Sequence, residues 1–383
     1  MLPVPAQPPR SVVQPVDRAA ETVRPGVPPP EPPAEPPKGR LGRVKAFFGR
    51  HRTILWWMHS TYALSLGVMV ILFAQEGFAH ARALAATLGA ALLVMLVVFR
   101  VFGHGDEQKN NVDKTRGSKI RFLLITYLLK NLYQPMLFFV LPFYWNSSSI
   151  DSMNGWFVFL LGLLALASTM DIIFDRLLVR RRLIAAIYYG LTLFACLNLV
   201  IPALFPNVKT VLTLMSSAFL SVVGFWLLHF PLRTLTTRRA WVILGTVALS
   251  FSSLVYLCRR GIPPVPLYVQ HGAVGPQRLA DGRLAMEVGA VHTSLLDDLW
   301  AVTDVALPGG EGDSFRHVWR YRDGDFRQDV PTVKTVGATP GTIRLTSALR
   351  KVSLPREVVG HWTVDVVTED GQIVGRTRFT VIK

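Results

Sequence analysis

Cysteine is nearly absent from this chain of 383 residues, and acidic residues are scarce. The two cysteines, Cys196 and Cys258, both lie in apolar runs, and residues 265–383 contain none. A disulfide framework or a cysteine-based metal site is therefore excluded in the C-terminal third of the chain. Asp and Glu number 25 against 41 Lys and Arg, which gives a formal net charge of +16.

The position of this positive charge argues against nucleic-acid binding. Residues 1–264 hold 27 basic and 11 acidic residues, whereas residues 265–383 hold 14 of each. The excess lies in the N-terminal tail and between apolar runs, where the orientation of a membrane protein requires it. We therefore expect a lipid bilayer as a partner and no nucleic acid.

The first 52 residues read as two segments that precede the membrane. Residues 1–38 contain 13 of the 26 prolines and no aromatic residue, which predicts a disordered Pro-rich tail. This tail serves either as a spacer or as a ligand for a proline-recognition domain. Residues 39–52 alternate apolar and basic side chains at helical spacing, which predicts a basic juxtamembrane helix.

Residues 53–260 are dominated by apolar runs that approach the ~20 residues needed to cross a bilayer. We expect about seven spans, near Thr53–Phe73, Ala83–Phe102, Ile120–Trp145, Trp156–Leu178, Leu183–Phe205, Val211–Phe230 and Trp241–Cys258. Basic residues concentrate in alternate connections, which predicts a cytoplasmic N-terminus. With seven spans, the C-terminal domain is then extracytoplasmic, in the periplasm of a bacterium whose inner membrane holds the protein. A proline linker, residues 261–271, follows the last span.

Residues 272–383 switch to the period-two alternation of β-strands. Asp323-Gly324 predicts a hairpin turn that brings Tyr321 opposite Phe326. Asp370-Gly371 predicts a second hairpin, in which Trp362 pairs with Phe379 on the buried face and Asp365 pairs with Arg376 on the exposed face.

Further strands near Leu299–Leu307 and Thr342–Leu349, and one or two within Gly272–Val291, complete the predicted domain. The fold class that we expect is an all-α transmembrane helix bundle followed by an antiparallel, immunoglobulin-like β-sandwich.

The C-terminal 90 residues resemble a β domain known as domain of unknown function 2914. The likeness is carried by His317–Gly324, by Arg344 to Ser347, by the pattern Gly360/Trp362/Val364/Val366, and by Phe379/Val381. The multi-pass region with its proline-rich exit is similar to a companion bacterial membrane family, also of unknown function. These resemblances imply a location in the cell envelope and supply no activity.

One candidate site lies inside the predicted membrane region. Its polar residues are Lys130, Asn131, Gln134, Asp171, Asp175 and Asn198. A charge at the depth of Lys130 is costly, so we expect it to face the bundle and to pair with Asp171. Two interpretations remain: a salt bridge that fixes helix packing, or an ion or proton site in a transporter or channel.

A second candidate site is the outward face of the last hairpin, which could bind an anionic glycan or a protein partner. Its residues are Arg344, His361, Thr363, Asp365, Arg376 and Arg378. The competing interpretation is an ordinary solvated sheet face. His317 shares a strand face with Phe315, Trp319 and Tyr321, so we expect it to be a satisfied histidine of the core or its rim and not a ligand.

The sequence contains no metal-ligand spacing and no nucleophile motif. We therefore expect no cofactor, no metal and no enzymatic activity. The function that the sequence predicts is an envelope anchor, scaffold or sensor whose β domain binds an envelope component.

Overall fold

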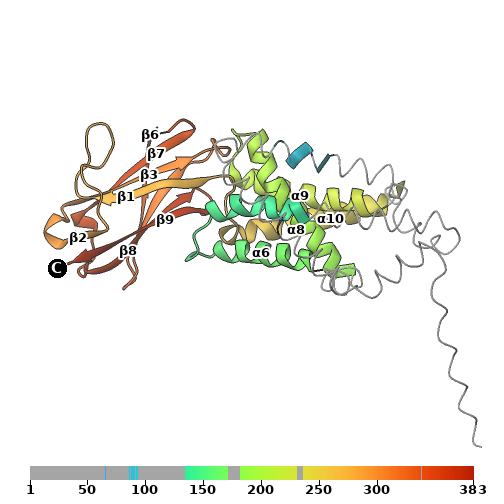
Figure 1. Cartoon of the computed structure of the whole chain (residues 1–383), viewed down its shortest axis with the longest axis horizontal. Coiled ribbons are helices and arrows are strands. Elements are labelled where there is room, and N and C mark those ends of the chain that lie inside the picture. The colour runs from blue at the N-terminus through green and yellow to red at the C-terminus, as the bar shows by residue number, and fades with distance from the viewer. Residues whose placement is uncertain are drawn as a thin grey trace, which may run out of the picture. The chain divides into compact units, whose positions relative to one another are not determined.

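The computed structural model describes residues 65, 86, 88–90, 92–93, 134–170, 182–230, 236–337 and 339–383. The predicted tail and juxtamembrane helix lie outside these residues. So do the first two predicted spans, apart from a few positions, and much of the third. Helices occupy the N-terminal part of the described chain, and strands occupy the C-terminal part (Figure 1).

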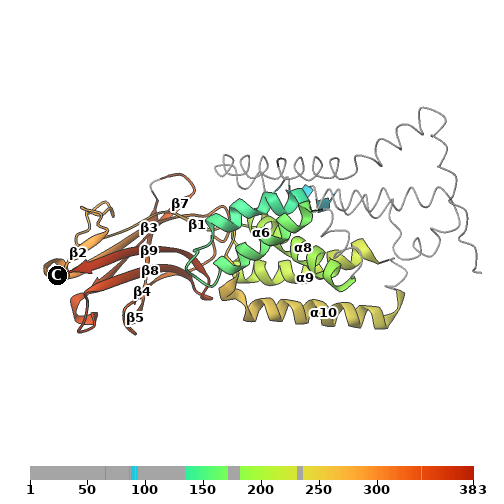
Figure 2. The same ribbon diagram turned by 60° about the horizontal axis from the view of Figure 1, so that its bottom comes forward.

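Five helices of more than two turns are described. The first covers residues 134–146. The others are α6 (Gly155–Thr169), α8 (Arg182–Leu204), α9 (Thr210–His229) and α10 (Arg238–Leu257). Helix α9 packs between α8 and α10, as Figure 2 shows. The sequence has no acid inside α8, α9 or α10, and their apolar composition lets them pack against one another and against lipid.

Three of the described helices, α8, α9 and α10, are long and apolar enough to cross a membrane. They match the last three predicted spans to within three residues at each end. Helix α6 is apolar but has only 15 residues, and the rest of the predicted span Trp156–Leu178 is described only as far as Met170. The structure therefore supports three spans among the described residues, and the expected count of seven is not supported.

The C-terminal region forms two β-sheets. The four-stranded sheet has the order β1-β3-β7-β6, and the five-stranded sheet has the order β2-β9-β8-β4-β5. The strands are β1 (Tyr268–Gly275), β2 (Ala290–His292), β3 (Asp298–Ala306), β4 (Phe315–Tyr321), β5 (Arg327–Pro331), β6 (Val333–Val336), β7 (Thr342–Arg350), β8 (Gly360–Thr368) and β9 (Ile373–Ile382). All neighbouring strands are antiparallel except β2 and β9, which are parallel. The prediction of a wholly antiparallel fold is wrong at this pair.

Strand β1 begins at Tyr268, inside the range that the sequence assigned to a linker. It pairs along β3 from Tyr268↔Ala306 to Gly275↔Trp300. The proline stretch that separates the last helix from the first strand is therefore shorter than expected.

The registers of both predicted hairpins are confirmed. In the first, the Tyr321 N–H donates to the Phe326 carbonyl at 3.1 Å, and β4 pairs with β5 in the same register. In the second, Trp362 pairs with Phe379, and Asp365 pairs with Arg376. The register shifts by one residue between Val366 and Val367. The turn between β8 and β9 is therefore one residue longer than the predicted two-residue turn. Gly371 has φ +87°, a conformation that glycine adopts without a steric penalty.

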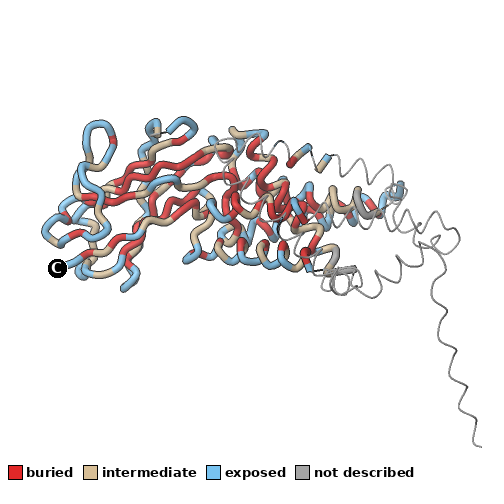
Figure 3. The backbone as a smooth tube through the Cα atoms, viewed as in Figure 1, coloured by how far each residue is buried: buried red, intermediate tan, exposed pale blue. Residues whose placement is uncertain are grey.

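The two sheets contribute to one apolar cluster. Trp319, Trp362 and Phe379 of the five-stranded sheet lie in it with Leu299 and Leu349 of the four-stranded sheet. The rings of Trp362 and Phe379 stack with centroids 6.0 Å apart. Figure 3 shows the long buried stretches of the strands that meet there. Burial of these large side chains is the main stabilising contribution to this region.

Loops at one end of the sheets contact the helical part. The β3–β4 loop packs against the α8–α9 connection, where Glu311 N–H donates to the Pro206 carbonyl at 2.7 Å. A Cβ on Gly309 would lie 2.4 Å from the Pro202 carbonyl oxygen, so this approach requires glycine. In the β8–β9 turn, the Gln372 side-chain amide donates to the Ile262 carbonyl at 3.1 Å.

Candidate functional site

The outward face of the five-stranded sheet is rich in arginine. Alternation along β4 turns His317, Trp319 and Tyr321 inward, and Arg316 and Arg320 outward. The same rule applies to the neighbouring strands. We call the following residues the arginine face: Arg316 and Arg320 in β4, Arg322 directly after it, Arg327 in β5, and Arg376 and Arg378 in β9.

The strand register places three of these arginines in one row. Arg378 pairs with Thr363, Thr363 pairs with Arg320, and Arg320 pairs with Arg327. Neighbouring strands lie ~4.8 Å apart, so the row spans ~14 Å across four strands. Such a row presents three guanidinium groups, with Thr363 between Arg378 and Arg320, to any ligand that lies across the sheet.

Acidic residues only partly neutralise this face. Asp365 in β8 is fully buried and accepts two hydrogen bonds from Arg376, at 2.5 and 2.9 Å. Arg320 Nε also lies 3.5 Å from the Asp365 carboxylate. Asp329 in β5 lies near Arg316 and Arg327. These two aspartates, together with Asp151 from the loop described next, set three carboxylates against six arginines, so the face keeps a positive excess.

The loop between helix 134–146 and α6 covers one side of the arginine face. The Asp151 carbonyl accepts a hydrogen bond from Arg376 Nη1 at 3.0 Å. The Asp151 carboxylate forms an ion pair with Arg378 and lies 4.0 Å from Arg322. Asn154 Nδ2 donates to the Ile373 carbonyl at 2.8 Å. The helical part is therefore joined to β9 by direct polar contacts.

The predicted ligand face is corrected in three respects. Asp365 is fully buried and Thr363 is 1% exposed, so they do not form an exposed surface. Their burial follows from the long arginine side chains and the Asp151 loop that lie over them. Arg344 lies in β7 of the other sheet, where it forms a two-point ion pair with Asp304, both contacts at 2.8 Å. The hydrogen bonds to Asp304 raise the pKa of Arg344.

The remaining members of that prediction lie at the edges of the face. His361 contacts Asp323, whose carboxylate accepts the His361 backbone N–H at 2.7 Å. This backbone hydrogen bond lowers the pKa of Asp323. Arg378 has a side chain that is 61% exposed and remains accessible from solvent.

The intramembrane site is described only in part. Lys130, Asn131, Asp171 and Asp175 lie outside the described residues, so the proposed pairing of Lys130 with Asp171 stays a prediction. Gln134 and Asn198 are both buried. Asn198 Nδ2 donates to the Tyr144 hydroxyl at 3.1 Å, and that hydroxyl donates to the Ala195 carbonyl at 3.2 Å. Asn198 thus has a packing role within the helices.

His317 lies in the β core as expected. It is fully buried, and its Nδ1 lies 2.7 Å from the Ser347 hydroxyl. Burial lowers its pKa to about 3, which keeps the imidazole neutral at ordinary pH. Among the described residues, no group of three or more His, Cys, Asp and Glu side chains is arranged to hold a metal ion.

Two known families match most of the chain. Residues 38–290 match a family described as "Family of unknown function (DUF5924)". The chain belongs to this DUF5924 family. Residues 313–381 match a second family, "Protein of unknown function (DUF2914)", which confirms the resemblance seen in the sequence. No protein with a curated description matches the chain.

The two matches divide the β region unevenly. The DUF5924 match extends past α10 through β1 and reaches Ala290, whereas the DUF2914 match covers β4 to β9 except the last residue of β9. Four of the six arginines in the arginine face were not included in the ligand face predicted from the sequence: Arg316, Arg320, Arg322 and Arg327. The signal was available in the alternating segment from Arg316 to Arg327. Asp151 carried no signal, because it lies in an irregular polar loop.

Proposed function

We propose that this DUF5924 protein is a multi-pass protein of the bacterial inner membrane whose β domain binds an anionic component of the cell envelope. The membrane part anchors the domain, and the arginine face is the binding surface. In this proposal the two sheets form an immunoglobulin-like sandwich, and the distribution of basic loops orients the domain to the periplasm. The seven-span count belongs to the same proposal, because an odd number of spans is needed.

The observation that carries the proposal is the row Arg378–Thr363–Arg320–Arg327. Guanidinium groups bind phosphate and carboxylate with two parallel hydrogen bonds, and they remain charged at every physiological pH. In this row the side chains of Arg320, Arg327 and Arg378 are 39%, 53% and 61% exposed. They are therefore available to a ligand, unlike Arg376, which is 11% exposed.

The proposed role is non-enzymatic, because the arginine face has donors and no candidate nucleophile. The acidic residues of the face already form ion pairs with arginines. The buried hydroxyl of Thr363 has no described contact with a side chain that could act as a general base. A surface of this kind can hold an anionic polymer in place and report its presence to the helices through the Asp151 loop.

The experiment is a binding measurement on the full-length protein in lipid nanodiscs. The probes are fluorescent dextran sulfate and polygalacturonate, with uncharged dextran as the reference. We expect binding of both polyanions and no binding of dextran, with affinity that falls as salt rises. Arg320→Gln together with Arg327→Gln should weaken polyanion binding about tenfold, the equivalent of ~1.4 kcal/mol.

Arg350→Gln is the matched control. Arg350 is an exposed arginine in β7, on the other sheet, and its substitution should leave polyanion binding unchanged. Arg320→Gln and Arg327→Gln are also measured singly, because each removes one charge, as Arg350→Gln does. Equal loss in the three single variants would show that net charge alone drives binding. Equal affinity for dextran and dextran sulfate would overturn the proposal.

A further inference from the structure

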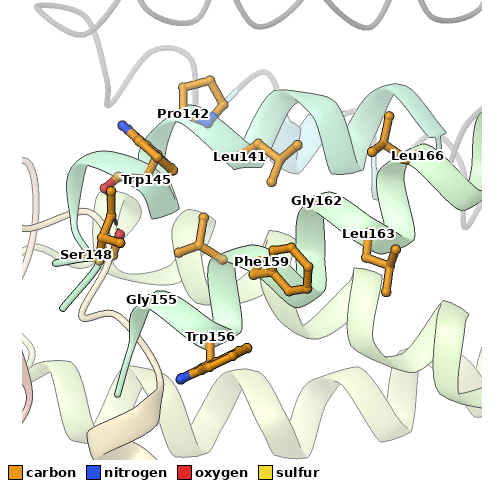
Figure 4. A pocket seen from close by; sticks show the side chains of 12 residues that line it. Leu141, Pro142, Trp145, Ser148, Gly155, Trp156, Phe159, Gly162, Leu163 and Leu166 are labelled. Carbon is orange, nitrogen blue, oxygen red and sulfur yellow. Dashed lines mark hydrogen bonds between the residues drawn. The ribbon is translucent and has the colours of Figure 1, made fainter. Parts of the chain in front are cut away.

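An apolar groove lies between helix 134–146 and α6, with a volume of about 770 Å³ (Figure 4). Its walls include Leu141, Trp145, Trp156, Phe159, Leu163 and Leu166. Cavities of ~300–1,000 Å³ are typical of sites for small ligands. In Figure 4 the side chains of Leu141 and Phe159 project into the space between the two helices.

The chemistry of the groove favours a hydrocarbon chain. Ser148 is the one lining residue with an aliphatic hydroxyl, and its Oγ already donates to the Trp145 carbonyl at 2.9 Å. Trp145 and Trp156 lie at the end of the groove near the loop between helix 134–146 and α6, and they are 55% and 75% exposed. Tryptophan is enriched where a membrane meets water, since its ring is apolar and its N–H is polar.

The polar end of the groove adjoins the arginine face. Ile150 lines the groove, and the next residue, Asp151, contacts Arg322, Arg376 and Arg378. A molecule with its chain in the groove would therefore bring its head near guanidinium groups. Arg322 and Arg378, with side chains 49% and 61% exposed, can turn from Asp151 toward an anion.

We propose that this groove binds one acyl chain of an anionic phospholipid, with the phosphate of the headgroup held by Arg322 and Arg378. The site shares Arg378 with the proposed polyanion-binding row, but its groove is built from the helices and it does not need Arg320 or Arg327. The charge complementarity selects an anionic lipid over a zwitterionic one, and the apolar walls select a lipid over a soluble phosphate.

Gly162 provides a direct way to block the groove. It lines the groove in α6, and a Cβ added there would meet no atom within 4 Å. Gly162→Phe therefore fills the space without a clash at the Cβ. Gly245 in α10 is a matched control, because a Cβ added there also meets no atom within 4 Å and Gly245 does not line the groove.

The test is native mass spectrometry of the full-length protein, titrated with phosphatidylglycerol or phosphatidylcholine in a mild detergent. The wild type should bind one phosphatidylglycerol about tenfold more tightly than phosphatidylcholine. Gly162→Phe should lose this binding, and Gly245→Phe should retain it. Arg322→Gln with Arg378→Gln should bind both lipids alike. The polyanion binding of Gly162→Phe should equal that of the wild type, which separates this site from the proposed function.

A second measurement covers the case in which Gly162→Phe does not fold. Brominated phosphatidylglycerol should quench the fluorescence of the wild type, and Trp156→Phe should remove part of that quenching, whereas Trp241→Phe in α10 should remove less. The proposal is overturned if Gly162→Phe binds lipid like the wild type, or if the wild type binds both lipids equally. It is also overturned if Phe159→Cys crosslinks to another part of the chain or to a second copy and lipid binding is then lost.

Discussion

Asp365 in β8 and Arg376 in β9 face each other across the strand pair and form a two-point ion pair in which the carboxylate is fully buried. The carboxylate also lies beside Arg320, and Arg376 donates onward to the Asp151 carbonyl. This one pair therefore links the outward face of the five-stranded sheet to the loop between two helices. Loss of either partner should affect both parts of the protein.

Removal of the buried carboxylate should be strongly destabilising. Asp365→Ala leaves Arg376 nearly buried without its main partner, and breaking a buried pair in this way costs ~3–5 kcal/mol. Thermal unfolding of the full-length protein in detergent measures the effect. The double variant Asp365→Leu/Arg376→Met should recover much of the loss, because no charge is left buried. A double variant less stable than Asp365→Ala would contradict this account.

The loop that contains Asp151 should detach from β9 when the Asp151 carboxylate is removed. Asp151→Ala removes the ion pair with Arg378 and leaves the fold intact, since Asp151 is an exposed loop residue. Hydrogen exchange of residues 147–154 should become faster, and the β core should be unaffected. Asp297→Ala, at an exposed ion pair with Lys351, is the control and should change nothing at the loop. Unchanged exchange in Asp151→Ala would show that the ion pair does not hold the loop.

The Ser347 hydroxyl should make a large contribution to the stability of the β domain. It lies 2.7 Å from His317 Nδ1 and accepts a hydrogen bond from Trp319 Nε1 at 3.3 Å. Ser347→Ala leaves both buried groups without this partner, at a cost of ~1–3 kcal/mol for each. The thermal midpoint should fall clearly. Ser294→Ala breaks a similar contact to His292 at an exposed position and should have little effect, so an equal loss in both would refute this explanation.

Asp313 should make stability depend on pH between about 4 and 6. Both of its carboxylate oxygens accept from the Thr210 backbone N–H at the start of α9, and burial raises its pKa to about 6. Glu369 and Asp370 contribute to the same shift. Because the folded state holds this proton more tightly than the unfolded state, the contribution of Asp313 is largest below pH ~4 and is lost as pH rises through ~6.

The variant Asp313→Asn isolates this contribution, because asparagine keeps an oxygen that can accept from Thr210. A rise of ~2 pKa units corresponds to ~3 kcal/mol between the two ends of the range. The midpoint of Asp313→Asn minus that of the wild type should therefore increase from pH 4.5 to pH 6.5. A difference that stays constant across this range would show that Asp313 does not titrate there.

The hairpins were predictable because local chemistry determines them. Asp323-Gly324 and Asp370-Gly371 mark turns, and the alternation around them allows a single register that buries Trp362 and Phe379 together. The parallel pairing of β2 with β9 was not predictable. Strand β2 has three residues, too few for a periodic pattern, and its partner lies about 90 residues away.

The site was harder to predict than the fold. Alternation places Asp365 and Arg376 on the outward face, but it cannot show that the Asp151 loop, more than 200 residues earlier, lies over them. Arg344 was assigned to the wrong sheet, because its pairing with Asp304 depends on how β3 and β7 lie beside each other. Contacts between distant segments leave no periodic signal in either segment.

The central claim is that the β domain lies outside the cytoplasm and is anchored by the helices. The test is Val352→Cys, at a position that is 97% exposed, in a chain that also carries Cys196→Ala and Cys258→Ser. Cells with a permeabilised outer membrane are treated with a membrane-impermeant maleimide. Labelling in intact spheroplasts is the predicted result. Labelling only after lysis would place the β domain in the cytoplasm and contradict the account.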